Sequence, residues 1–130
     1  MGQEARRDLE ALHPRLLKLH KTLLDHERAG YEKVFGKVTS QALLQLLLND
    51  QWFAWLRPLS QLIVRIDEAL DKRSATGTAK EAQAIIDYTS TLLRASEQGN
   101  LFSMSYYTAL QDEPAVVLAH AEARKLLKKK

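Results

Sequence analysis

Apolar residues return every three or four positions through most of this chain, and this spacing places them on one face of an α-helix. In the segment from residue 3 to residue 35, leucines follow a heptad-like seam: Leu9, Leu12, Leu16, Leu19 and Leu23. The alternation typical of strands extends over only a few residues at a time. The sequence therefore predicts an all-α fold.

Prolines, glycines and capping residues divide this pattern into segments. Pro14 either kinks the first helix or marks the place where the helix properly begins. Gly36 ends the first helix, and Thr39 or Ser40 caps a short extra helix near residues 40–48. Pro58 interrupts the next helix or starts its second half. We expect the first and second long helices to be kinked or broken.

Four long segments follow when the chain is divided at Pro14, Gln51, Thr78 and Ser103. Each has roughly 21 to 26 residues, which is about 30 to 40 Å of helix. A loop at 72–80 precedes the third segment, and Thr78 and Glu81 form a capping box at its start. Matched lengths and short loops predict an antiparallel four-helix bundle, with residues 1–130 in one domain.

The distribution of charged residues indicates whether the chain binds nucleic acid. The formal net charge is +3, but the basic tail at 124–130, RKLLKKK, carries five positive charges, so the other 123 residues sum to −2. A nucleic-acid binder spreads its basic residues over one folded face, so we predict no specific nucleic-acid binding. No apolar stretch is long enough for a membrane span.

The chain contains no cysteine, which excludes disulfides and thiolate metal sites and favours a cytoplasmic location.

An aromatic cluster lies between Trp52 and Pro58, and it includes Phe53 and Trp55. On an α-helical wheel both tryptophans continue the core stripe, whereas Phe53 stands to one side of it. We interpret the indoles as core residues and expect Phe53 to face a protein partner. The alternative is a small-ligand-binding bundle with Trp52 and Trp55 as its aromatic wall.

Polar groups also occur where the helices should be apolar. His20 and Glu27 lie in the leucine arc of the first helix, and Asp67 and His120 border the apolar faces of later helices. Helical bundles hold metals with these side chains, so the four residues are candidate metal ligands or acid/base groups. The seven-residue spacing of His20 and Glu27, about 10.5 Å along the axis, speaks against a shared ion. Hydrogen bonding to neighbouring carboxylates or backbone, inside or at the rim of the core, is the alternative that we favour, and no cofactor is predicted.

The runs LLNDQWFAWLRPLSQLIVRIDEALD and LHKTLLDHERAGYE resemble small bacterial proteins of an uncharacterised all-helical family. The resemblance covers most of the chain, from about Leu12 to Leu127. It implies a bacterial, cytoplasmic protein and brings no activity, cofactor or functional residue.

Apolar helix faces exceed what one bundle needs, because the piece from Ala42 to Leu48 carries leucines on nearly every side. We therefore expect a non-catalytic protein that acts by self-association or by binding a protein partner. The alternative from another class is a metal-dependent or acid/base enzyme with His20, Glu27 and His120 in its site.

Overall fold

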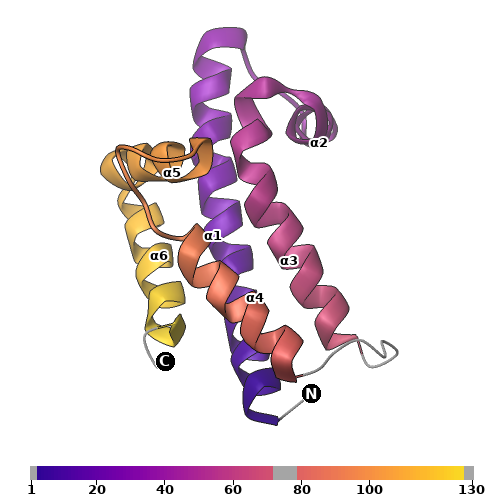
Figure 1. Ribbon diagram of the computed structural model, residues 1–130. Helices are drawn as coiled ribbons and strands as arrows, with labels where there is room; N and C mark the ends of the chain where they lie inside the picture. The colour runs from indigo at the N-terminus through magenta and orange to yellow at the C-terminus, as the bar shows by residue number, and fades with distance from the viewer. Residues whose placement is uncertain (1–2, 72–78, 128–130) are drawn as a thin grey trace.

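The computed structural model describes residues 3–71 and 79–127, and the secondary structure within these ranges is entirely helical (Figure 1). This confirms the all-α prediction. The elements in chain order are α1 (Gln3–Phe35), α2 (Ser40–Asn49), the 3₁₀ segment η1 (Gln51–Leu56), α3 (Arg57–Leu70), α4 (Ala79–Leu92), α5 (Leu101–Asp112) and α6 (Pro114–Leu127).

The longest helix, α1, packs against α3, α4, α6 and η1. Its five seam leucines are all at most 1% exposed, so the predicted seam is the centre of the core. Gly36, at φ 93°, ends the helix as expected, because this left-handed conformation suits a residue without a side chain. Pro14 lies inside α1, so the prediction that the helix begins near Pro14 is wrong. The buried leucines on both sides of Pro14 outweigh the one backbone hydrogen bond that proline lacks.

The second predicted helix is broken, as expected. Thr39 caps α2 by accepting a hydrogen bond from the Ala42 amide at 3.1 Å, and Asp50 caps η1 through the Trp52 amide at 2.8 Å. Pro58 lies in the first turn of α3, where its missing N–H costs no helical hydrogen bond.

The prediction of matched rods is wrong for the second half of the chain. The third helix, α4, ends at Leu92, well before the division expected at Ser103, and the expected fourth rod is two helices that meet at Glu113. Asn100, not Ser103, caps α5 by accepting a hydrogen bond from the Ser103 amide at 2.8 Å. The proposed cap at Thr78 and the last three lysines of the tail lie outside the described residues.

The helices run in alternating directions along α1. In Figure 1, α1 rises, α3 and α6 descend, and α5 lies across the upper part of the molecule. The core between them is built from leucine, isoleucine and alanine side chains, together with Phe53, Trp55, Phe102 and Tyr106. Among the described residues, no helix has the length and apolarity needed to cross a membrane.

Candidate functional site

Two of the predicted site residues join α1 to α3. His20 Nε2 lies 2.7 Å from Ser60 Oγ, at hydrogen-bond distance. Burial lowers the pKa of His20, because the protonated ring would lose solvation. Asp67 Oδ1 lies 2.6 Å from Nε2 of His13, without the alignment of a hydrogen bond. Both pairs fasten neighbouring helices together.

A third predicted residue, His120, joins α6 to α5. Its Nδ1 lies 2.6 Å from the hydroxyl oxygen of Tyr106, a side chain with no exposed surface. Burial raises the pKa of Tyr106 far above the ordinary value for a phenol, because a phenolate would be poorly solvated there, while Arg124 opposes the shift weakly. The hydroxyl therefore stays protonated and serves as a polar contact inside the core.

The structure does not bring His20, Glu27, Asp67 and His120 together, since each contacts a different neighbour. Across residues 3–71 and 79–127, no group of three or more histidine and carboxylate side chains is placed to hold a metal ion. The contacts of these four residues agree with the alternative interpretation, in which polar groups on apolar faces are paired with neighbouring side chains.

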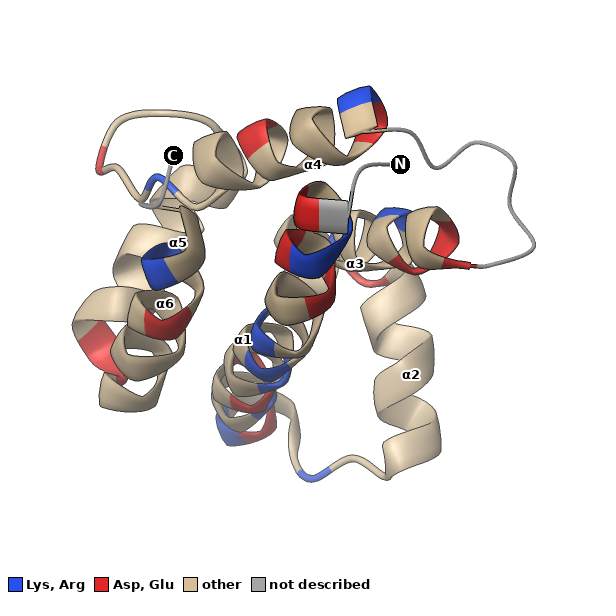
Figure 2. Ribbon diagram, turned by 90° about the horizontal axis from the view of Figure 1, so that it is seen from below, with Lys and Arg blue, Asp and Glu red and all other residues tan. Residues whose placement is uncertain are grey.

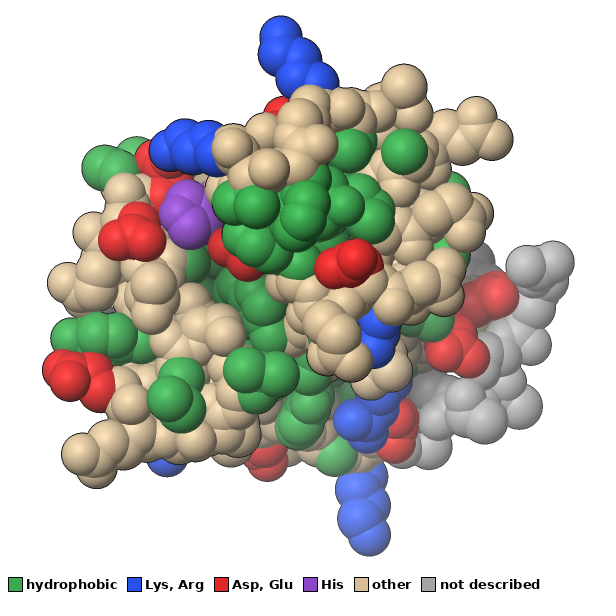
Figure 3. Space-filling view, turned by 90° about the horizontal axis from the view of Figure 1, so that it is seen from above, with side chains coloured by type: hydrophobic (Ala, Val, Ile, Leu, Met, Phe, Trp, Pro, Cys, Tyr) green, Lys and Arg blue, Asp and Glu red, His purple; other side chains and the backbone are tan. Residues whose placement is uncertain are grey.

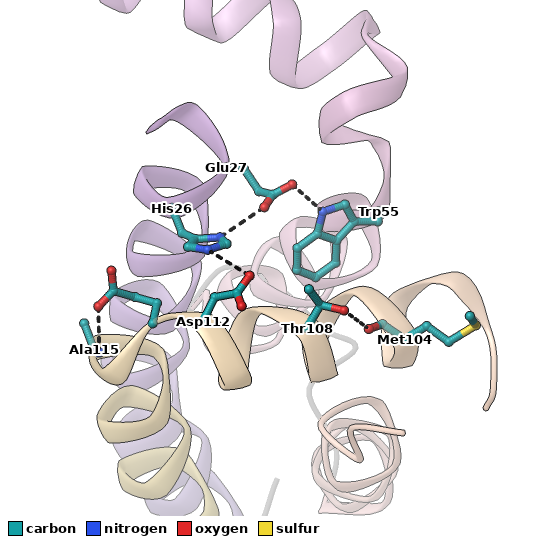
Figure 4. A network of polar contacts seen from close by, with 8 residues as sticks. His26, Glu27, Trp55, Met104, Thr108, Asp112 and Ala115 are labelled. Carbon is teal, nitrogen blue, oxygen red and sulfur yellow. Dashed lines mark hydrogen bonds and ion pairs between the residues drawn. The ribbon is translucent and has the colours of Figure 1, made fainter. Parts of the chain in front are cut away.

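A polar cluster that the sequence did not reveal surrounds His26 (Figure 4). Its Nδ1 lies 3.1 Å from Glu27 Oε2, and its Nε2 lies 3.9 Å from Asp112 Oδ2 at the end of α5. The other oxygen of Glu27 accepts a hydrogen bond from the Trp55 indole N–H at 3.1 Å. The cluster thus places an imidazole between two carboxylates from different helices.

The two ring nitrogens of this imidazole are close to different carboxylates, an arrangement that acid/base chemistry could use. The cluster borders an open groove of about 840 Å³ between α1 and the junction of α5 with α6. Thr22, Gly30 and Lys33 line the groove from α1, and Trp52 lines it from η1. Sequence reasoning missed His26 because a position next to Glu27 falls off the leucine arc, and Asp112 because it ends a helix.

The two indoles differ in their surroundings. Trp55 is 7% exposed, and its ring centroid lies 5.5 Å from that of Phe102 in a tilted contact, so it is a core residue. It also borders a smaller hollow beside His26. Trp52 is half-buried, and its ring lies beside Gly30, where an added side-chain carbon would be 3.4 Å away, in ordinary contact. The core interpretation therefore fits Trp55 better than Trp52.

Phe53 is fully buried, so its predicted place at the side of the core stripe is wrong. The reason is the 3₁₀ geometry of η1, in which residues three apart lie on the same side. Phe53 therefore shares a face with Leu56, which is also fully buried, and its ring lies 5.6 Å from that of Tyr31. An α-helical wheel turns by only about 100° per residue and misplaces it.

A second surface feature is α2, which contains no charged residue (Figure 2). Only Leu43 of this helix is buried, against η1, while Leu44 is 54% and Leu48 is 59% exposed. At the same end of the molecule, Val34 and Phe35 are exposed in the last turn of α1. Viewed onto this end, hydrophobic side chains form a patch near the centre of the face (Figure 3).

The segment that leads into α2 is fastened to α1. Arg28 donates a hydrogen bond from Nη2 to the Val38 carbonyl at 2.6 Å, and Glu32 accepts one from the Val38 amide at 2.8 Å. These contacts lower the pKa of Glu32, the Val38 amide contributing most. The start of α2 is therefore positioned by side chains of α1.

Comparison of the chain with protein-family models, curated proteins and solved structures found no match. Any functional conclusion therefore depends on the chemistry of the surfaces described above.

Proposed function

We propose that this protein is a non-catalytic antiparallel bundle, with α1, α3, α4 and α6 as its four helices, that binds a protein partner through α2. The observation that carries the proposal is the composition of α2, a ten-residue helix without a charge, two of whose five leucines, Leu44 and Leu48, are more than half exposed. A surface helix normally carries polar residues on its outer face. An uncharged, leucine-rich outer face is typical of a protein-binding surface.

The partner we propose offers an apolar groove that encloses α2. A ten-residue helix is about 15 Å long. Two such helices side by side cover much less than the roughly 800 Å² per partner of a stable interface, so pairing of α2 with its own copy is too small. A groove that contacts Leu44, Leu48 and the sides of the helix together buries more of the leucine surface.

The contacts of Arg28 and Glu32 with Val38 support this function because they order the segment before binding. A binding helix that is already positioned loses less conformational freedom on association, which favours affinity. The hypothesis of an acid/base or metal enzyme and the hypothesis of a small-ligand site stay predictions. The His26 cluster, with an imidazole between two carboxylates, contains side chains of the kind that the first would use.

Photo-crosslinking tests the proposal. A photoreactive amino acid replaces Leu48 in one sample and Val64, which is 55% exposed on α3, in the control. We expect position 48 alone to give a covalent adduct with one defined protein. That protein should then bind the purified chain, and Leu44→Lys should weaken this binding. Identical adducts at both positions, an adduct only with a second copy of this chain, or binding unaffected by Leu44→Lys would each contradict the proposal.

A further inference from the structure

A second surface, independent of α2, follows the seam between α1 and α6. The two helices run in opposite directions here (Figure 1). The groove beside His26 shares Thr22 and Ala115 with a second hollow lower on the same seam, which is lined by Pro14, Arg15, Lys18, Leu118, Ala119 and Glu122. One continuous groove therefore extends in both directions from Thr22 and Ala115.

The two halves of this seam groove carry opposite charge. The half beside His26 is lined by four carboxylates, from Asp25, Glu27, Asp112 and Glu113, and by one ammonium group, from Lys33. One of the four, Asp25, is paired with Lys21 at 2.8 Å. The other half is lined by two cations and one carboxylate. That carboxylate, from Glu122, is paired with Lys125 at 3.3 Å. The groove is thus acidic at one end and basic at the other.

The basic half of the groove also carries apolar surface. Leu118 projects from α6 and is 70% exposed, beside Ala115, Ala119 and Pro14. A leucine this exposed inside a groove leaves apolar surface in water. Apolar side chains beside charged ones are also found in protein interfaces, which have a hydrophobic core and a polar rim.

We infer that a second copy of this chain occupies the seam groove, related to the first by a twofold axis through Thr22 and Ala115. Such an axis joins the acidic end of each groove to the basic end of the other. Lys18 and His26 each lie four residues from Thr22 along α1, in opposite directions, which is about 6 Å along the helix axis. His26 contacts Asp112. The axis therefore brings Lys18 opposite the partner's Asp112, twice in the dimer.

The charge pattern selects a second copy over an unrelated protein. A twofold contact brings the same surface of both copies together, so most charged grooves meet their own sign in it. This groove meets the opposite sign, because its acidic and basic halves lie on opposite sides of the axis. The exposed Leu118 of each copy lies about 4.5 Å along α6 from Ala115, and the two leucines meet near the axis.

Charge-reversal variants test this dimer in sedimentation experiments at low salt. Lys18→Glu places two like-charged carboxylates at each of the two contacts, and Asp112→Lys places two ammonium groups there. We expect the unmodified chain to dimerise and each variant to dimerise at least about tenfold more weakly. Lys80→Glu, the same charge change at an exposed position on α4, is the matched control and leaves the dimer unchanged.

The decisive sample is an equimolar mixture of Lys18→Glu and Asp112→Lys, because their heterodimer restores an opposite-charge pair at both contacts. Recovery of the dimer in this mixture, with Leu44→Lys/Leu48→Lys still dimeric, supports the seam interface and separates it from α2. Three results would overturn the inference. They are a wild-type chain that stays monomeric at about 100 µM, single variants that dimerise as well as the wild-type chain, and a mixture that stays monomeric. Circular dichroism verifies that each variant is folded.

Discussion

Replacing Phe53 by alanine distinguishes the 3₁₀ geometry of η1 from an α-helical continuation. In the structure Phe53 has no exposed surface and packs 5.6 Å from the ring of Tyr31. Truncating a buried phenylalanine removes its apolar contacts and leaves a cavity, which costs about 3–5 kcal/mol of unfolding free energy. If η1 were α-helical, Phe53 would lie beside the core stripe and the same change would cost about 0.5 kcal/mol or less.

Urea denaturation followed by circular dichroism measures this difference. With a urea dependence of about 2 kcal/mol per molar, Phe53→Ala lowers the midpoint by about 2 M. Val64→Ala, at a side chain that is 55% exposed, is the control and shifts the midpoint by no more than about 0.3 M. If Phe53→Ala prevents folding, Phe53→Leu gives a milder loss of about 1 kcal/mol. A cost no larger than that of Val64→Ala would refute the geometry.

Three further predictions concern single contacts. Thr39→Ala removes the cap of α2, costs about 1 kcal/mol and speeds hydrogen exchange of the Ala42 amide; unchanged exchange would contradict the cap. Because burial lowers the pKa of His20, the unfolded chain binds a proton more readily near pH 6 than the folded chain does. Stability therefore falls as the pH drops below about 6.5, and urea titrations of His20→Asn give a flatter profile. Tyr106→Phe leaves Nδ1 of His120 without its hydroxyl partner and lowers the unfolding free energy by about 1–3 kcal/mol; a neutral effect in the same titration would argue against that hydrogen bond.

Much of the fold could be predicted because local chemistry determines it. The leucine seam of α1, the glycine at its end and the cap at Thr39 are short-range signals, and the structure uses them as expected. Pro58 similarly marks the start of α3. Each of these features depends on the backbone geometry of a few adjacent residues.

The errors arose where tertiary packing decides between local alternatives. Pro14 can start a helix or lie within one, and burial of leucines on both sides of it favours the continuous helix. The apolar residues of η1 fit both an α-helical and a 3₁₀ wheel, and only the contact of Phe53 with the core shows which one forms.

The candidate site was less predictable than the fold. Glu27 was recognised from its place on the leucine arc, but its neighbours His26 and Asp112 were not, because Asp112 is distant in sequence and meets α1 only in the folded chain. The charge pattern of the seam groove is hidden for the same reason. It combines residues of α1 with residues of α5 and α6, and no single segment carries it.

The most direct test of the proposed function is the affinity of the purified chain for the protein crosslinked at position 48, measured by calorimetric titration. Leu44 and Leu48 are about half exposed, and covering the remainder of both contributes about 2 kcal/mol, or about 30-fold in the dissociation constant. We predict that the double variant Leu44→Lys/Leu48→Lys raises the dissociation constant by at least about 30-fold, while Val64→Lys leaves it unchanged. Equal affinities for the wild-type chain and the double variant would contradict the role of α2.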